Sequence, residues 1–328
     1  MKTFRVAIFV LLLIALSFGI YYYQNFTPAT QTNFGLTFST RYAAYLGFDP
    51  KQMYLDILSD LKPKKLRLIA YWEDIEPQRG KFDFQQMDEM LAESDKEKID
   101  VILDLGLKQP RWPECHQPAW YNDLNQEQQK QAILSMLQAS VTHFKKFSSI
   151  KTWQIENEPY FVFGLSCPAM DPGQVQNEIK LVKENDSRPV IITDSGERGN
   201  WVRTAQYADE LGVTMYRTVY SSWFGYYHYP IPAWFYRLKA GYFKTFENKP
   251  IVGIELQAEP WFIKAIADTD LDTQKTLMNP KVFETNIEYA RKAGIGDNYL
   301  WGAEWWYWMA KHNGDWGMWA AAKKLLSN

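Results

Sequence analysis

The feature that most constrains the fold is a regular alternation of short apolar runs with amphipathic segments from about residue 34 onward. The runs predict eight β-strands at Phe34–Thr37, Lys65–Ala70, Val101–Leu105, Lys151–Glu156, Val190–Thr193, Val213–Tyr216, Ile251–Glu255 and Tyr299–Gly302. The segments between them predict helices; Asp49-Pro50, for example, is a typical helix start. Eight strand–helix units in roughly 290 residues predict a single (β/α)8 barrel rather than an open sheet.

Composition and motifs argue against several other classes. The chain of 328 residues has a formal net charge of -2, which argues against nucleic acid as a partner because phosphate binding needs a strongly basic surface. No Gly-x-Gly-x-x-Gly motif opens a helix after the first predicted strand, so a dinucleotide site lacks its main support. We expect neither a metal nor an organic cofactor, since the two cysteines and the histidines show no metal-ligand spacing.

The first 24 residues differ from the rest of the chain. Val6–Ile20 is apolar and uncharged, follows Lys2 and Arg5, and is separated from the next charged residue, Arg41, by a polar stretch. This pattern predicts an export signal or an uncleaved membrane anchor, and both interpretations stay open. We therefore expect a signal or anchor over residues 1–24, a linker over 25–33 and one barrel domain over 34–328. The barrel is expected to be extracytoplasmic, with the membrane as a partner if the segment is retained.

Two predicted strands lead into glutamates. Trp153–Pro159 is an apolar run that ends in Asn-Glu-Pro and places Glu158 where the fourth strand becomes a loop, and Glu255 ends the seventh predicted strand. The carboxyl ends of barrel strands share one rim, so these two side chains should face each other. Retaining cleavage of a glycosidic bond needs a proton donor and a carboxylate nucleophile about 5–5.5 Å apart. We interpret Glu158 as the acid/base and Glu255 as the nucleophile.

Asn157-Glu158-Pro159 after one strand, with Glu255 ending a later one, resembles the clan A glycoside hydrolases, which are (β/α)8 barrels. Leu66–Leu68 followed by Trp72–Pro77 and Gly80–Asp83 resembles the second-strand region of families 5 and 42. The resemblance implies that Arg67 supports the nucleophile, that Tyr216 contacts its carboxylate and that Trp301 is the platform beneath the reacting sugar.

Further substrate contacts are expected from position alone. Asn157 neighbours the acid/base and is expected to hydrogen-bond a sugar hydroxyl. Trp72 and Trp261 each follow a strand end, where a ligand-facing ring is favoured. Glu259 lies in the loop after Glu255 and is a rival nucleophile. Alternation along the strand predicts that Glu156 points away from Asn157.

The loops after the third and fourth predicted strands contain Cys115 and Cys167, and an exported protein could pair them as a disulfide. His116 is expected to be a satisfied loop histidine. Trp112 and Trp120 either stack on sugar rings or pin a proline-rich loop. Glu304, beside two tryptophans, either binds substrate or forms a structural salt bridge.

These residues predict a retaining glycoside hydrolase that acts on the β-linked O-glycosidic bonds of an extracytoplasmic oligo- or polysaccharide, so the expected partner is a carbohydrate. Two alternatives remain: a transglycosylase that remodels an envelope glycan, and a non-catalytic carbohydrate-binding barrel held at the membrane. A pure binder would not need two ionisable groups at matched strand ends.

Overall fold

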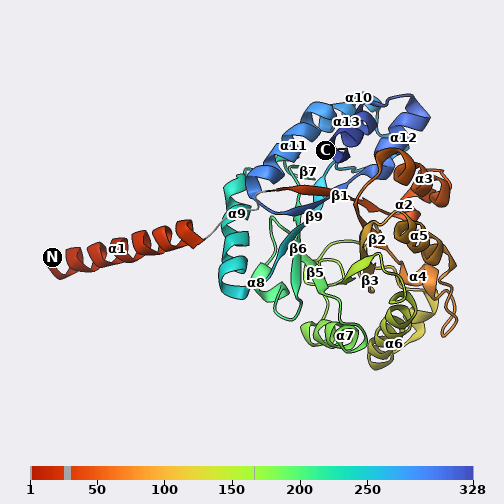
Figure 1. The fold of residues 1–328 in the computed structure, drawn as a ribbon, viewed down its shortest axis with the longest axis horizontal. Helices are drawn as coiled ribbons and strands as arrows, with labels where there is room; N and C mark the ends of the chain where they lie inside the picture. Colours follow the sequence, from red (N-terminus) through yellow and green to blue (C-terminus); the bar gives the residue numbers. More distant parts are fainter. Residues whose placement is uncertain (1, 26–30, 166, 328) are drawn as a thin grey trace.

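A computed structural model describes residues 2–25, 31–165 and 167–327 (Figure 1). Eight parallel strands close into a barrel in the order β1-β10-β9-β6-β5-β4-β3-β2, which confirms the predicted (β/α)8 fold. The barrel strands are β1 (Asn33–Phe38), β2 (Lys65–Ile69), β3 (Asp100–Leu105), β4 (Ile150–Ile155), β5 (Val190–Asp194), β6 (Glu210–Met215), β9 (Ile251–Gln257) and β10 (Asp297–Trp301).

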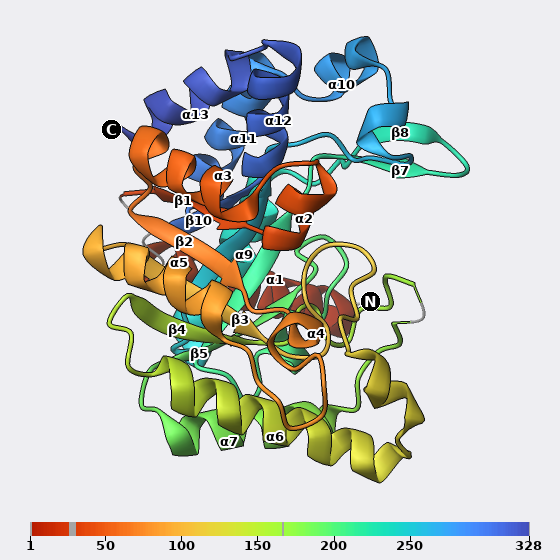
Figure 2. The same cartoon turned by 90° about the vertical axis from the view of Figure 1, so that its right-hand side faces the viewer.

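Helices surround the barrel and separate successive strands in the chain (Figures 1 and 2). The described helices are α1 (Lys2–Asn25), α2 (Thr40–Tyr45), α3 (Pro50–Asp56), η1 (Ile57–Leu61), α4 (Trp72–Ile75), α5 (Gln85–Lys96), η2 (Ala119–Asp123), α6 (Gln126–Phe144), α7 (Pro172–Asn185), α8 (Trp201–Thr204), α9 (Ala233–Tyr242), η3 (Phe243–Glu247), η4 (Ile266–Asp268), α10 (Leu271–Leu277), α11 (Pro280–Ala293), α12 (Ala303–Asn313) and α13 (Gly317–Leu326).

The helix starts follow from local chemistry. The side chain of Asp49 accepts a hydrogen bond from the backbone N–H of Gln52, and Pro50 occupies the first helical position of α3. Asn125 and Gln128 form a reciprocal capping box at the start of α6. These caps satisfy backbone groups that a helix end leaves without partners, so they fix where each helix begins after its strand.

The interior of the barrel is filled by side chains and is not a channel. Ile102, Ile191, Val252, Ile254 and Tyr299 form an inner cluster, and burial of each aliphatic side chain contributes about 1.5–3 kcal/mol. A much larger apolar layer lies between the strands and the surrounding helices. This packing makes the strand ends a rigid frame for the loops that follow them.

Two elements were not predicted from the sequence. β7 (Thr218–Ser221) and β8 (Gly225–His228) form an antiparallel hairpin between β6 and α9, which projects beyond the barrel (Figure 2). The aromatic run Tyr226–Tyr229 lies largely in its second strand. β9 also continues to Gln257, so Glu255 lies within the strand and not at its end, which corrects the predicted boundary.

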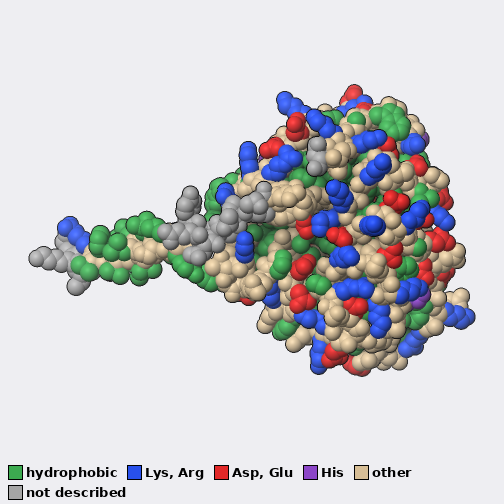
Figure 3. All heavy atoms as spheres, viewed as in Figure 1, with side chains coloured by type: hydrophobic (Ala, Val, Ile, Leu, Met, Phe, Trp, Pro, Cys, Tyr) green, Lys and Arg blue, Asp and Glu red, His purple; other side chains and the backbone are tan. Residues whose placement is uncertain are grey.

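The N-terminal helix α1 projects from the side of the barrel (Figure 1), and its apolar surface contrasts with the mixed charges of the body (Figure 3). Phe4–Tyr21 has a mean hydropathy of 2.3 and is long and apolar enough to cross a membrane. One such helix near the N-terminus fits a signal or an anchor. Most of the expected linker, residues 26–30, lies outside the described residues.

Candidate active site

The two predicted acids lie at the same rim of the barrel. Glu158 follows β4 by three residues, and Glu255 lies near the carboxyl end of β9. Glu158 has a left-handed backbone (φ 44°), a conformation that few non-glycine residues adopt. Its backbone N–H donates to Oγ1 of Thr193 over 2.8 Å, and Nζ of Lys108 donates to its carbonyl over 3.0 Å. These contacts hold the turn that presents Glu158.

The Glu255 carboxylate is held from both sides. Nη1 of Arg67 donates to its Oε1 over 2.9 Å, and the Tyr216 hydroxyl donates to its Oε2 over 2.8 Å. Arg67 is fully buried and Glu255 is 5% exposed. A guanidinium and a phenol that donate to the two oxygens of one carboxylate fix its orientation. The structure therefore brings together the two residues expected around the nucleophile.

Arg67 links Glu255 to the loop that carries Glu158. Its Nε donates to Oε1 of Gln154, and its Nη2 donates to Oδ1 of Asn157, over 2.8 and 2.9 Å. Thr193 donates to the same Asn157 oxygen over 3.0 Å. Because Arg67 is fully buried and donates to Gln154, Glu255 and Asn157, it is better described as a positioning residue than as a substrate-binding one.

The environment of Glu158 favours the protonated acid. Burial raises the pKa of Glu158 well above its usual value, and the negative charges of Glu255, Glu114 and Asp194 raise it further. The Lys108 ammonium acts in the opposite direction but does not outweigh burial. Of the three negative charges, that of Glu255 contributes most to this rise in the Glu158 pKa.

A third carboxyl group, Glu114, is a site residue that sequence reasoning missed. Glu114 is 8% exposed and has a left-handed backbone (φ 78°). Burial together with the charge of Glu255 raises its pKa to about 8, while the neighbouring Lys108 ammonium and Asn157 side chain act in the opposite direction. The sequence did offer one signal for Glu114, which is that it directly precedes Cys115. A disulfide at Cys115 holds the neighbouring residues of the loop in place.

Glu156 points away from this pocket, as predicted. Its Oε1 and Oε2 accept from the backbone N–H groups of Leu107 and Lys108 over 2.8 and 2.6 Å. Burial is the main cause that raises the pKa of Glu156 to about 7. Gly106 is required beside it, since a Cβ there would lie 2.6 Å from the Glu156 carboxyl carbon. Glu156 therefore anchors the loop after β3.

The rival nucleophile, Glu259, belongs to a different network. Arg111 forms ion pairs with Glu259 and Glu304, and its guanidinium lies between the rings of Tyr42 and Trp301, 3.6 and 3.9 Å from their centroids. The backbone N–H of Ser39 also donates to Glu304. Both acids are thus engaged in a buried structural cluster, which favours the salt-bridge interpretation of Glu304 and leaves Glu255 as the better-placed nucleophile.

The tryptophans predicted to contact substrate differ in how deeply they are buried, and Trp72 lies in the core. Trp72 is fully buried, its indole N–H donates to Glu76, and it packs against Trp120 and Tyr121. The structure therefore corrects its assignment as a substrate residue: it follows a strand end but turns into the core. Trp120 likewise donates to the Glu76 carbonyl and pins the loop.

Trp301 and Trp261 lie nearer to the two acids. Arg111 covers one face of Trp301, which is 7% exposed. Trp261 is partly exposed and packs edge-on against Tyr216, with centroids 5.3 Å apart. Trp261 thus has more surface available to a ligand than Trp301.

The loops after β3 and β4 are joined by a disulfide between Cys115 and Cys167, which confirms the predicted pairing. His116 is satisfied within its loop, with Nδ1 3.1 Å from Glu73 and Nε2 3.0 Å from the Arg111 carbonyl. Trp112, in contrast, is 64% exposed. The disulfide therefore fixes a loop that carries both Glu114 and an exposed ring.

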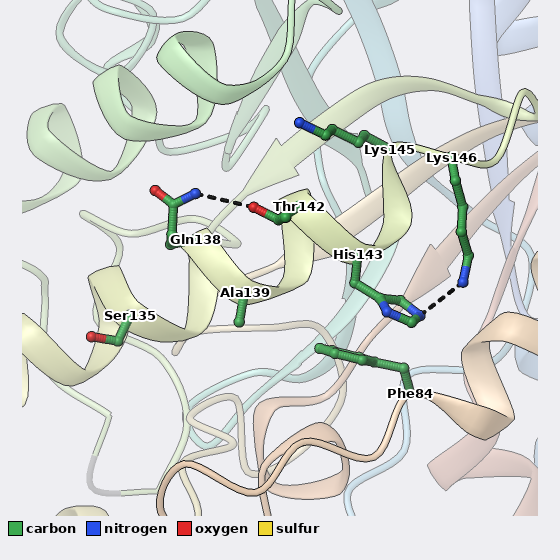
Figure 4. Close-up of a pocket in the computed structure, with 8 residues that line it drawn as sticks. All are labelled: Phe84, Ser135, Gln138, Ala139, Thr142, His143, Lys145 and Lys146. Atoms are coloured by element: carbon green, nitrogen blue, oxygen red, sulfur yellow. Dashed lines mark hydrogen bonds between the residues drawn. The ribbon is translucent and has the colours of Figure 1, made fainter.

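A surface cavity of about 900 Å³ is separate from this site (Figure 4). It lies along α6 and is lined by Phe84, Ser135, Gln138, Ala139, Thr142, His143, Lys145 and Lys146. It contains no carboxyl group and lies away from the strand ends, so we assign it no part in the chemistry. Among the described residues, no group of three or more His, Cys, Asp or Glu side chains could hold a metal ion.

Comparisons with known proteins agree with the barrel fold. The family 42 glycoside hydrolases, described as β-galactosidases, match residues 58–132. No match of significant similarity was found among curated proteins. Many solved structures share the fold, and three of them are described below.

The first is GH5_18 from Streptomyces cattleya in complex with GlcNAc, at 12% identity and a TM-score of 0.59, covering 84% of this chain and 71% of that one. The second is xylanase 10B from Thermotoga petrophila RKU-1 in complex with xylobiose, at 14% identity and a TM-score of 0.60, covering 90% and 94%. The third is endo-glycoceramidase II from Rhodococcus sp., a lactosyl-enzyme intermediate, at 13% identity and a TM-score of 0.53, covering 82% and 73%.

The partial family match and the barrel together support a glycosidase, and the chain resembles the clan A glycoside hydrolases of families 5 and 42.

Proposed function

We propose that this protein is a retaining glycoside hydrolase that cleaves β-linked O-glycosidic bonds of an extracytoplasmic oligo- or polysaccharide. The observation that supports this most directly is the unequal environment of two neighbouring acids at one rim. Burial and nearby charge favour the neutral acid at Glu158, whereas Arg67 and Tyr216 both donate to the Glu255 carboxylate. Pairs of carboxyl groups held in different protonation states are what acid and nucleophile roles require.

In the first step, Glu158 gives its proton to the glycosidic oxygen as the Glu255 oxygen attacks the anomeric carbon from the opposite face. The carbon–oxygen bond breaks, the leaving group departs as an alcohol, and a glycosyl ester forms on Glu255. In the second step, ionised Glu158 takes a proton from water, and the resulting attack releases the sugar and restores both carboxyl groups. The anomeric configuration is inverted twice and so retained.

The remaining residues position the substrate and the nucleophile. Arg67 and Tyr216 hold Glu255, and Arg67 with Thr193 holds the Asn157 amide beside the acid. In our proposal Asn157 contacts a sugar hydroxyl, while Trp261 and the exposed part of Trp301 provide apolar surface for sugar rings. Because these hydrogen-bond donors are already in place, the site needs little rearrangement during the reaction.

The proposed location rests on two features. The apolar helix containing Phe4–Tyr21 would direct export or retain the protein at the membrane, and the Cys115–Cys167 disulfide suits an oxidising compartment. The ligands named for the neighbours, GlcNAc, xylobiose and a lactosyl group, favour a carbohydrate substrate here without selecting a sugar. Transglycosylation is the second candidate, because exposed aromatic rings near the acids would bind an acceptor.

The test uses alanine variants of the three glutamates with an activated aryl β-glycoside and azide. We expect Glu255→Ala with azide to yield the α-glycosyl azide, because azide fills the space of the lost nucleophile and inverts the centre once. Glu158→Ala should yield the β-glycosyl azide, because azide attacks the glycosyl ester without needing a base. Product anomers are read by NMR.

The control is Glu259→Ala, which should give no azide product. An inverted azide product from Glu259→Ala would move the nucleophile to that residue. Full activity in either Glu158→Ala or Glu255→Ala would refute the proposed mechanism. In the same assays, product analysis with an added acceptor sugar distinguishes hydrolysis from transglycosylation.

A further inference from the structure

A line of aromatic rings runs from the Glu255 carboxylate to the surface. Tyr216, which donates to Glu255, packs against Trp261 with ring centroids 5.3 Å apart. Trp261 packs against Phe163 at 6.1 Å, and Phe163 packs edge-on against Trp112 at 6.4 Å. Exposure increases along this line, since Trp261 is partly exposed while Phe163 and Trp112 are 37% and 64% exposed. Each ring touches the next, so the line offers a continuous apolar path outward from the two acids.

Several elements hold these rings in place. Phe163 lies in the loop after β4 and Trp112 in the loop after β3, and the Cys115–Cys167 disulfide joins the two loops. The backbone N–H of Leu165 also donates to the carbonyl of Pro113 over 3.1 Å. The hairpin supports the inner end, where the Tyr226 hydroxyl donates to the Trp261 carbonyl over 3.0 Å. A surface fixed by this many contacts is already ordered before a ligand arrives, which lowers the entropic cost of binding.

The position of Glu158 indicates which part of a substrate would meet these rings. In the proposed reaction Glu158 protonates the leaving oxygen, so the leaving group must lie on the Glu158 side of the broken bond. Glu158 and Phe163 lie five residues apart in the same loop after β4. The outer rings therefore lie on the leaving-group side of the pocket.

The neighbouring side chains indicate the chemical class. Val162 and Leu165, which flank Phe163 in the loop, are 72% and 62% exposed. Sugar subsites combine an aromatic face with polar groups that bind hydroxyls, but aliphatic side chains offer no hydrogen bonds. Exposed apolar residues that gather at one place favour an apolar ligand.

We propose that Trp112, Phe163 and Trp261, with Val162 and Leu165, form a subsite for an apolar chain in the leaving group, so that the substrates are glycosides of alkyl or lipid-like alcohols. This inference rests on the proposed function, because that reaction defines the leaving-group side. It narrows the substrate class beyond an unspecified glycan.

The test compares matched methyl and n-hexyl β-glycosides, at concentrations below micelle formation, of the sugar that a 4-nitrophenyl β-glycoside screen selects. The wild-type protein should hydrolyse the hexyl glycoside with the higher kcat/KM. In Trp112→Ala/Phe163→Ala the hexyl-to-methyl ratio should fall about tenfold, because the rings that cover the chain are lost. Trp223→Ala/Phe224→Ala is the control: it removes the same residue types at 88% and 80% exposed positions of the hairpin and should leave the ratio unchanged.

An unchanged ratio in Trp112→Ala/Phe163→Ala would refute the subsite. A larger loss for a trisaccharide of the same sugar than for the hexyl glycoside would also refute it, by assigning the rings to sugar stacking. Calorimetric binding of the hexyl and methyl glycosides to the Glu255→Gln protein separates this inference from the proposed function. Suppose that the wild-type protein shows no turnover, but that the hexyl glycoside binds and this binding is lost when the rings are removed. That result would support the subsite and refute the proposed enzymatic function.

Discussion

Tyr216, which directly follows β6, donates its hydroxyl hydrogen over 2.8 Å to Oε2 of Glu255 on the neighbouring strand β9. Arg67, on β2, donates to the other carboxylate oxygen, so two groups from different parts of the barrel fix the orientation of Glu255. The Tyr216 ring also packs against Trp261. One tyrosine thus connects the proposed nucleophile to the aromatic surface beside it.

Tyr216→Phe removes the hydroxyl but keeps the ring packing. We expect kcat/KM on an aryl β-glycoside to fall by about 10- to 100-fold, because the carboxylate loses a charge-assisted hydrogen bond that orients it. The melting temperature should change little. Tyr220→Phe, at a 39% exposed hairpin position, is the control, and wild-type kinetics in Tyr216→Phe would show that the hydroxyl does not support the reaction.

Glu114→Gln tests the third carboxyl group through the pH profile of kcat/KM. The active form carries the Glu158 proton, so activity falls at alkaline pH as Glu158 ionises. Above about pH 8 Glu114 is ionised, and its charge raises the pKa of Glu158. Removing that charge should lower the pKa of Glu158, so the alkaline fall should move to lower pH.

The comparison for this variant is Glu127→Gln, an exposed residue of α6, whose profile should match that of the wild type. A carboxyl 13C titration of Glu158 in the substrate-free protein provides a readout that does not need turnover. If Glu114→Gln changes neither the titration of Glu158 nor the pH at which kcat/KM falls on the alkaline side, the role of Glu114 is limited to holding the loop.

Replacing both disulfide cysteines, Cys115→Ser/Cys167→Ser, should destabilise the protein. The bridge joins residues 52 positions apart, and closing a loop of this length in the unfolded chain gives a stabilisation of about 4 kcal/mol. Equilibrium unfolding in urea should show a loss of about 2–4 kcal/mol. Reducing the wild-type protein should reproduce most of that loss; equal stability with and without reductant would argue against this role.

Gly106→Ala tests the packing beneath the loop after β3. Gly106 has φ 153°, and an added Cβ would meet the Glu156 carboxyl carbon at 2.6 Å. We expect a loss of roughly 3 kcal/mol or more, from overpacking in addition to backbone strain. Gly80→Ala is the matched control, because Gly80 also has a positive φ (75°) but nothing within 4 Å of its Cβ.

The expected loss for Gly80→Ala is only about 1–2 kcal/mol, from the left-handed backbone alone. Urea unfolding of both variants measures the difference. Similar losses in the two proteins would mean that Glu156 moves aside easily and that contact with its carboxyl group does not constrain the loop.

Much of the fold was readable from the sequence because barrel strands and helices have strong local patterns. Every predicted barrel strand overlaps an observed one, and Asp49-Pro50 began a helix as predicted. The β7–β8 hairpin was missed because two four-residue strands in an aromatic, polar stretch show no clear alternation. Trp72 was misassigned because its position after a strand end does not determine which way a side chain turns.

By itself, the sequence determined the eight-strand barrel, the apolar N-terminal helix and the placement of Glu158 and Glu255 at one rim, although not the exact end of the strand that carries Glu255. These follow from local periodicity and from the rule that parallel strands end at the same face. Only the tertiary structure decided how the other charges are arranged. It placed Arg111 with Glu259 and Glu304, and it placed Glu114 beside Asn157. Contacts between residues distant in the chain depend on how loops pack on the closed barrel, which no local pattern encodes.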